Sequence, residues 1–229
     1  MDKLLTVVIP SYNVEKFLNQ TLDSFICDEA VMKKFEVIVV DDGSKDNTAK
    51  IGKEYADKYP DTFRVISKEN GGHGSTINCG IRNAVGKYFK VVDGDDWVNT
   101  ADFVKLVEDL EKTESEYVFT NYYEYYDDVN RQKAVDFPQF KDGTEYDFAD
   151  VANKVYIPMH ALVIKTSVLK DNNIVIDEKC FYVDVEYVMF PVPFVNKVTF
   201  FDLHVYMYRL ALSTQSVSIL GFQKHINDH

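Results

Sequence analysis

The sequence is short of cysteine, of positive charge and of long hydrophobic runs. Its three cysteines are odd in number, widely spaced and free of any CxxC or Cys/His ligand pattern, so neither a disulfide scaffold nor a zinc module is expected. The 25 Lys and Arg residues against 37 Asp and Glu residues give a net charge of −12, whereas a protein that coats nucleic acid needs a basic face. No stretch approaches the roughly 18 apolar residues that cross a bilayer.

The length and composition of the chain suit one large domain, or one domain with a small appendage. The chain has 229 residues, of which 46% are hydrophobic, so global disorder is excluded. The apolar run at residues 4–10 is too short for a signal peptide and is better explained as a buried strand. We therefore expect a reduced, cytoplasmic protein without a nucleic-acid partner.

Short β-rich runs alternate with helical runs over the first half of the chain. Strands are expected at residues 4–10, 35–41, 63–67, 88–92 and 117–121, and helices at residues 17–25, 46–55, 74–84 and 101–112. Strands that are apolar on both faces and separated by helices indicate a parallel sheet covered on both sides. Ligands of such sheets bind beyond the carboxyl ends of the strands.

The pattern changes after residue 121. Residues 122–126 alternate aromatic and polar side chains, and residues 131–137 can pair back on them as an antiparallel ribbon. Further short strands are expected at 161–165, 197–201 and 205–208. We expect residues 1–121 to form an α/β half and residues 122–229 a smaller mixed half packed on it, within one domain overall.

Polar and flexible residues follow four of the expected strands, at residues 10–13, 41–44, 70–74 and 93–96. Asp93 and Asp95, separated by one glycine, form a DXD pattern that can direct oxygens toward one divalent cation. An acidic surface turn would be the better explanation if this motif stood alone. However, Asp41 and Asp42 can accept hydrogen bonds from a base or a ribose, and Tyr12 can stack on a base.

In order and spacing, these motifs resemble family 2 glycosyltransferases with a GT-A fold. The resemblance rests on VVIPSYN at residues 7–13, VIVVDDGS at 37–44 with Asp46, NGG at 70–72 and VDGDD at 92–96. It implies a Rossmann-like, mostly parallel sheet flanked by helices, with a smaller mixed antiparallel region on the acceptor side. It also implies transfer of a sugar from a nucleotide-sugar, usually a UDP-sugar, to an acceptor hydroxyl, with inversion at the anomeric carbon.

The resemblance also assigns residues. It implies that Asp95 ligates Mn²⁺ or Mg²⁺, with Asp96 as a second candidate, and that Asp93 faces the ribose or the donor sugar. Arg209 would bind phosphate oxygens, a surface ion pair being the alternative. His73 can touch phosphate or sugar, although an ordinary loop histidine is the simpler explanation. The full set of candidate nucleotide- and donor-binding residues is Pro10, Tyr12, Asn13, Asp41, Asp42, Gly71, Gly72, Asp93 and Arg209.

Family members usually carry their catalytic base in a Glu-Asp pair in the second half. The nearest match here is at residues 181–190, where Val183 replaces the first acid. We expect Asp184 to be the base and keep Glu186 as its competitor. Either could instead be an inert carboxylate on a strand or at a helix end.

Two other functions remain open at this stage. The missing acid at Val183 motivates a catalytically inactive module that binds a nucleotide-sugar or a glycan. A sugar nucleotidyltransferase ranks last, because the first strand does not lead into a glycine-rich basic loop.

The chain ends just after an apolar segment at residues 219–222 that suggests an amphipathic helix. We therefore expect a truncated chain whose missing C-terminal region meets a glycan or lipid-linked acceptor, or the inner face of the membrane.

Overall fold

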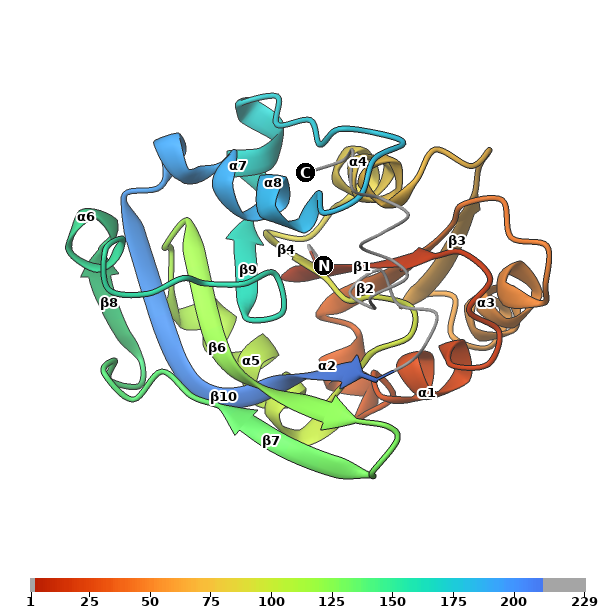
Figure 1. Ribbon diagram of the computed structural model, residues 1–229, viewed down its shortest axis with the longest axis horizontal. Coiled ribbons are helices and arrows are strands. Elements are labelled where there is room, and N and C mark those ends of the chain that lie inside the picture. The colour runs from red at the N-terminus through yellow and green to blue at the C-terminus, as the bar shows by residue number, and fades with distance from the viewer. Residues whose placement is uncertain (1–2, 212–229) are drawn as a thin grey trace.

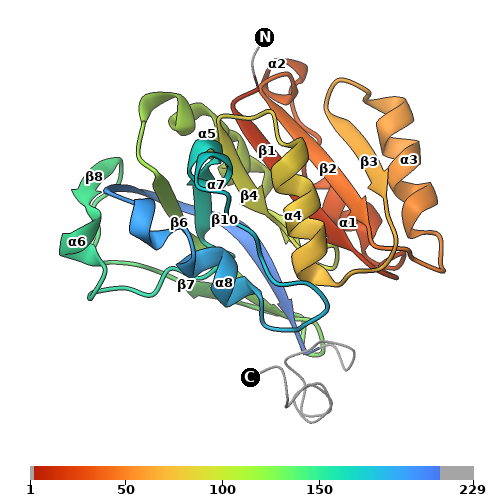
Figure 2. The same cartoon turned by 90° about the horizontal axis from the view of Figure 1, so that it is seen from above.

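A computed structural model describes residues 3–211, and the segment at 219–222 lies outside this range. These residues form one curved, ten-stranded sheet with helices on both faces (Figures 1 and 2). The strands are β1 (Leu5–Ser11), β2 (Phe35–Asp41), β3 (Phe63–Ser67), β4 (Tyr88–Val91), β5 (Trp97–Val98), β6 (Tyr117–Tyr126), β7 (Arg131–Val135), β8 (Thr144–Asp147), β9 (Leu162–Lys165) and β10 (Lys197–Leu210). The helices are α1 (Leu18–Asp23), α2 (Glu29–Met32), α3 (Thr48–Lys58), α4 (His73–Asn83), α5 (Thr100–Asp109), α6 (Phe148–Val151), α7 (Thr166–Asp171) and α8 (Asp184–Met189), with 3₁₀ turns at Leu110–Lys112 and Val192–Phe194.

The sheet is parallel at one side and mixed at the other. Its main path runs in the order β3-β2-β1-β4-β9-β6-β10-β5, and the pairs among β3, β2, β1 and β4 are all parallel. Strand β9 runs antiparallel to both β4 and β6, whereas β6 and β10 are parallel. The expected α/β fold is thus confirmed, with a parallel first half and antiparallel pairs in the second half that make the sheet as a whole mixed.

Strands β6 and β10 carry the chain through the second half. The expected ribbon is confirmed, since Tyr122–Tyr126 of β6 pairs antiparallel with β7. The two short strands expected at 197–201 and 205–208 are one strand, β10, with register shifts near His204. Because β6 extends across residues 121 and 122, the two halves share one continuous sheet.

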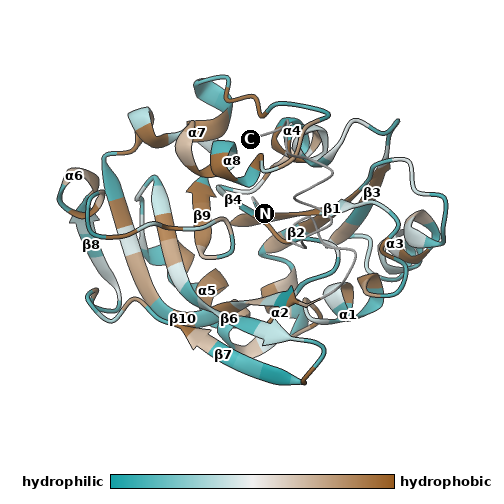
Figure 3. Ribbon diagram, in the orientation of Figure 1, coloured by the Kyte–Doolittle hydropathy of each residue, from teal (hydrophilic) through white to brown (hydrophobic). Residues whose placement is uncertain are grey.

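The buried strands explain the apolar runs in the sequence (Figure 3). Along β1, Leu5, Val7 and Ile9 face one hydrophobic cluster, which includes residues of α1, α2 and α5, and Val8 faces the other, which includes residues of α4, α7 and α8. Alternate side chains of a strand point to opposite faces, so a strand covered on both sides is apolar throughout. Within residues 3–211, no helix has the length and apolar character needed to cross a bilayer.

Helix α4 lies so close to β1 that its position Gly80 has no room for a side chain. A Cβ atom there would lie 2.7 Å from Cγ1 of Val8. We expect Gly80→Ala to lower the free energy of unfolding by about 1–3 kcal/mol, because overpacking outweighs the better helix propensity of alanine. Urea denaturation measures this, and an unchanged or higher stability would contradict the close packing of α4 on β1.

Candidate active site

A cleft of about 370 Å³ opens at the carboxyl ends of β1 and β4. Segments from all over the chain meet there: the loops after β1 and β4, the first residues of α4 and α8, the turn before β9 and the end of β10. The polar side chains that line the cleft are Tyr12, His73, Asp93, Asp95, Asp96, His160, Tyr182, Asp184 and Tyr208. The structure therefore brings the DXD motif and the expected base, Asp184, into one cavity.

The acidic turn after β4 depends on Gly94. Its amide donates to the Pro10 carbonyl at 3.1 Å, and a Cβ atom at Gly94 would lie 2.9 Å from the same oxygen. Only glycine therefore lets the turn cross the end of β1 at this distance.

In the same turn, burial, followed by repulsion from Asp93, raises the pKa of Asp95 to about 6. No other residue in the 3–211 range donates a hydrogen bond to the Asp95 carboxylate, which is thus available for a cation.

Asp96 is placed differently from Asp95. It is 1% exposed, and its two carboxylate oxygens accept hydrogen bonds from the Tyr206 hydroxyl at 2.6 Å and the Arg209 amide at 2.7 Å. Burial and the neighbouring Asp95 and Asp93 raise the pKa of Asp96 well above its ordinary value. Asp96 fastens the acidic turn to β10, which leaves Asp95 as the better-placed metal ligand of the two.

Arg209 lies beneath the acidic turn rather than on the surface. It is 5% exposed, and its guanidinium donates to the Asp95 carbonyl at 2.8 Å and to Gln20 at 2.6 Å. It also forms an ion pair with Asp127 and lies 4.7 Å from the Trp97 ring centroid. The alternative of a surface ion pair is therefore wrong. In this structure the guanidinium supports the backbone of the DXD motif.

A second cavity of about 530 Å³ adjoins the cleft, and Tyr12 lines both. The Tyr12 side chain is half exposed, as a base-stacking ring would be. Asp41 also lines this cavity and accepts a hydrogen bond from the Ser44 amide at 3.0 Å. Asn13 has a positive φ of 54° and accepts from the Lys45 amide at 2.8 Å. Asn13 therefore lines neither cavity and only holds Lys45, which lines the second cavity together with Tyr12 and Asp41.

Asp42 holds the glycine loop in place. It is 2% exposed, and its carboxylate accepts hydrogen bonds from the amides of Gly71 and Gly72 at 2.9 and 2.8 Å and from Lys68 Nζ at 2.7 Å. Gly72 has φ +84°, a region that favours glycine. In this structure Asp42, Gly71 and Gly72 fix the start of α4, and none of the three lines either cavity.

Two residues that support the site, Tyr206 and Lys90, were not predicted from the sequence, whereas His160, before the strand at 161–164, was considered able to reach the cleft and does line it. Tyr206 bonds both to Asp96 and, at 3.1 Å, to the Asp93 amide. The fully buried Lys90 donates to the His160 carbonyl at 2.8 Å, and burial lowers the Lys90 pKa to about 7. His160 stacks on Tyr208 with ring centroids 3.9 Å apart, and burial lowers its pKa to about 4, so it is neutral at pH 7. The alternation of aromatic residues along β10 is the sequence signal that could have indicated which face of this strand points toward the cleft.

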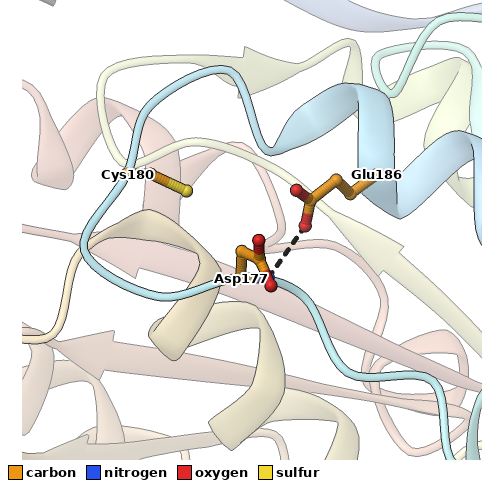
Figure 4. Close-up of side chains that lie close together, drawn as sticks. All are labelled: Asp177, Cys180 and Glu186. Carbon is orange, nitrogen blue, oxygen red and sulfur yellow. Dashed lines mark hydrogen bonds between the residues drawn. The ribbon is translucent and has the colours of Figure 1, made fainter. Parts of the chain in front are cut away.

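The two candidate bases point to different places. Asp184 is the first residue of α8 and lines the cleft, whereas Glu186 accepts a hydrogen bond from the Asp177 amide at 2.8 Å (Figure 4). The figure also shows Cys180 beside this pair, in the loop that leads to α8. Val183, which replaces the first acid, is 2% exposed and packs into the core. The geometry thus favours Asp184 over Glu186 as the base.

Comparison with known proteins agrees with the geometry. The family model "Glycosyl transferase family 2" matches residues 6–172. The uncharacterized glycosyltransferase EpsJ of Bacillus subtilis is 37% identical over 123 residues, which are 54% of this chain and 35% of EpsJ. The minor teichoic acid biosynthesis protein GgaB of the same species is 34% identical over 111 residues, which cover 48% of this chain and 12% of GgaB. The matched segment spans about a third or less of these relatives.

Solved structures share the fold. Residues 1–349 of TarS from S. aureus, in complex with UDP-GlcNAc, match with a TM-score of 0.76 and 23% identity, over 91% of this chain and 59% of that one. The mannosyltransferase PcManGT from Pyrobaculum calidifontis, in complex with GDP-Man and Mn²⁺, matches with a TM-score of 0.70 and 17% identity, over 100% of this chain and 63% of that one. The chain therefore has a GT-A α/β fold and belongs to glycosyl transferase family 2.

Proposed function

We propose that this protein is a metal-dependent, inverting glycosyltransferase that moves a sugar from a UDP-sugar to an acceptor hydroxyl. The observation that carries the proposal is the meeting of Asp93, Asp95 and Asp184 in one cleft. Two of these carboxylates come from the turn after β4 and the third from the first residue of α8. Among the relatives, EpsJ is named a glycosyltransferase, and TarS was solved with UDP-GlcNAc.

The donor side follows from charge and shape. Four aspartates line the cleft, which would repel a diphosphate unless a divalent cation came with it. The Asp95 carboxylate, which accepts no hydrogen bond from another residue in the described range 3–211, is the kind of oxygen ligand that Mg²⁺ and Mn²⁺ take, together with substrate phosphates. When bound, either cation supplies positive charge against which the diphosphate departs. Tyr12 would stack on the base, with Asp41 as its neighbour in the adjoining cavity.

The acceptor side centres on Asp184. Its carboxylate would take the proton of the acceptor hydroxyl while the acceptor oxygen bonds to the anomeric carbon and the bond to the diphosphate breaks. Attack opposite the leaving group inverts the anomeric centre. The acceptor is a glycan or a lipid-linked sugar, as the relationship to a teichoic acid biosynthesis protein suggests. Such chemistry fits a cytoplasmic protein at the inner face of the membrane.

Titration calorimetry with UDP, with and without Mn²⁺, tests the donor site. We expect UDP to bind in the presence of Mn²⁺ or Mg²⁺ and binding to weaken at least about tenfold with EDTA, because the acidic cleft then faces the diphosphate alone. Product analysis with a panel of UDP-sugars tests transfer. Metal-dependent binding without any turnover would favour the inactive binding module, and no binding of UDP in any condition would refute both the proposed transfer from a UDP-sugar and a module that binds a UDP-sugar.

A further inference from the structure

His73 occupies a position that the proposed reaction does not yet use. It is the first residue of α4, lines the cleft, and its Nε2 lies 2.8 Å from Oδ1 of Asp93. The two residues come from different motifs, the glycine loop and the DXD turn. Their contact therefore ties the start of α4 to the acidic turn.

The backbone around His73 is fixed from two sides. On one side, Asp42 binds the amides of Gly71 and Gly72. On the other, a Cβ atom at Gly74 would collide with the Asp177 carbonyl and would lie 3.0 Å from Cγ2 of Ile176. The first turn of α4 is thus wedged between β2 and the loop before α8. A histidine on so rigid a support can hold its partner in one orientation.

The contact leaves half of the Asp93 carboxylate available. Oδ1 is bound to His73, and the Asp93 amide donates to the Tyr206 hydroxyl at 3.1 Å. Among residues 3–211, no donor reaches Oδ2. An ionised carboxylate only accepts hydrogen bonds, so Nε2 of His73 is the donor in this contact. Asp93 is therefore held with one oxygen anchored and the other open to the cleft.

We propose that His73 is a positioning residue that orients Asp93 so that its second carboxylate oxygen accepts a hydrogen bond from a hydroxyl of the bound donor. The inference rests on the proposed function. The hydroxyl can belong to the ribose or to the transferred sugar, since both offer the same chemistry. A second His–Asp pair, His204 with Asp136 at 2.6 Å, has the same chemistry but lies outside the cleft, and it supplies a matched control.

The test compares His73→Leu with His73→Gln by titration calorimetry with Mn²⁺, using UDP and UDP-glucose as probes. We expect leucine to weaken binding about tenfold, because Asp93 loses its anchor. Glutamine, whose amide nitrogen occupies a position near Nε2, should restore most of the affinity. If leucine prevents folding, His73→Asn replaces it, because asparagine is polar but too short to reach Asp93. His204→Leu should leave both affinities unchanged.

The double variant His73→Leu with Asp93→Ala shows whether His73 acts through Asp93. We expect no further loss beyond Asp93→Ala alone, since coupled residues are not additive. Weakening of both probes assigns the hydroxyl to the ribose, and weakening of UDP-glucose alone assigns it to the sugar. Unchanged affinity in His73→Leu, no rescue by glutamine, or additive losses would each overturn the inference. If the wild type binds neither probe, the proposed function fails and this inference fails with it.

Discussion

Replacing Asp184 by asparagine is expected to slow sugar transfer by about 10²- to 10⁴-fold, the usual contribution of a general base. Asparagine has nearly the same shape but cannot take the acceptor proton. Asp184 lies at the start of α8 and lines the cleft from a different element than the acidic turn. Donor affinity should therefore change little. Initial rates with saturating donor, together with UDP binding by calorimetry, measure the two effects separately.

Glu186→Gln is the matched control for this experiment. The glutamine carbonyl can still accept the hydrogen bond from the Asp177 amide, so the loop before α8 keeps its conformation. We expect transfer within about twofold of the wild type, as for a substitution that keeps its contact. A large loss in Glu186→Gln with normal turnover in Asp184→Asn would exchange the roles of the two residues.

The strands could be predicted because local sequence determines them. The segment at residues 35–41 became β2 with the expected bounds, since its apolar and β-branched residues fit a strand buried on both faces. The order of the strands could not be predicted. Strand β9 inserts antiparallel between β4 and β6, and β10 pairs with β5 near the DXD motif. These pairings join segments far apart in sequence, and periodicity within a segment carries no information about its partner.

In the candidate site, too, local motifs could be predicted from the sequence, whereas contacts between distant residues could not. The acidic turn and the glycine loop could be located from strand ends, because strand ends of a parallel sheet meet at one edge. The sequence could not show that Asp95 is open to a cation while Asp96 is bonded within the protein. The placement of Asp96 depends on Tyr206 and Arg209, which lie 110 and 113 residues from it in the sequence. Likewise, only the structure shows that Asp42 is turned toward the glycine amides.

Asp95→Ala is expected to weaken metal-dependent UDP binding by about 100-fold or more, because the loss of a metal ligand costs at least as much as the loss of its supporting contacts. The same change should stabilise the metal-free protein. Burial and Asp93 raise the pKa of Asp95 to about 6. In the unfolded chain the pKa is about 4, so the folded state favours the protonated carboxyl. The ionised form therefore costs stability at pH 7.

The raised pKa of Asp95 also predicts how stability depends on pH, which can be measured separately from UDP binding. The contribution of Asp95 to wild-type stability without metal should fall as pH rises from about 4 to about 6, so the stability difference between the Asp95→Ala variant and the wild type should grow over this range. At pH 7 with EDTA, the variant should be more stable by about 1–3 kcal/mol, and near pH 4 the difference should vanish.

Asp96→Ala is the control for the Asp95 substitution, because it leaves the Tyr206 hydroxyl and the Arg209 amide without their acceptor. It should therefore destabilise the protein by about 1–3 kcal/mol for each buried group left unpaired. A stabilised Asp95→Ala variant that no longer binds UDP with Mn²⁺ would show that Asp95 serves ligand binding and lowers the stability of the metal-free protein. If Asp95→Ala instead lowers stability and keeps full metal-dependent binding, the cation belongs to another residue of the cleft.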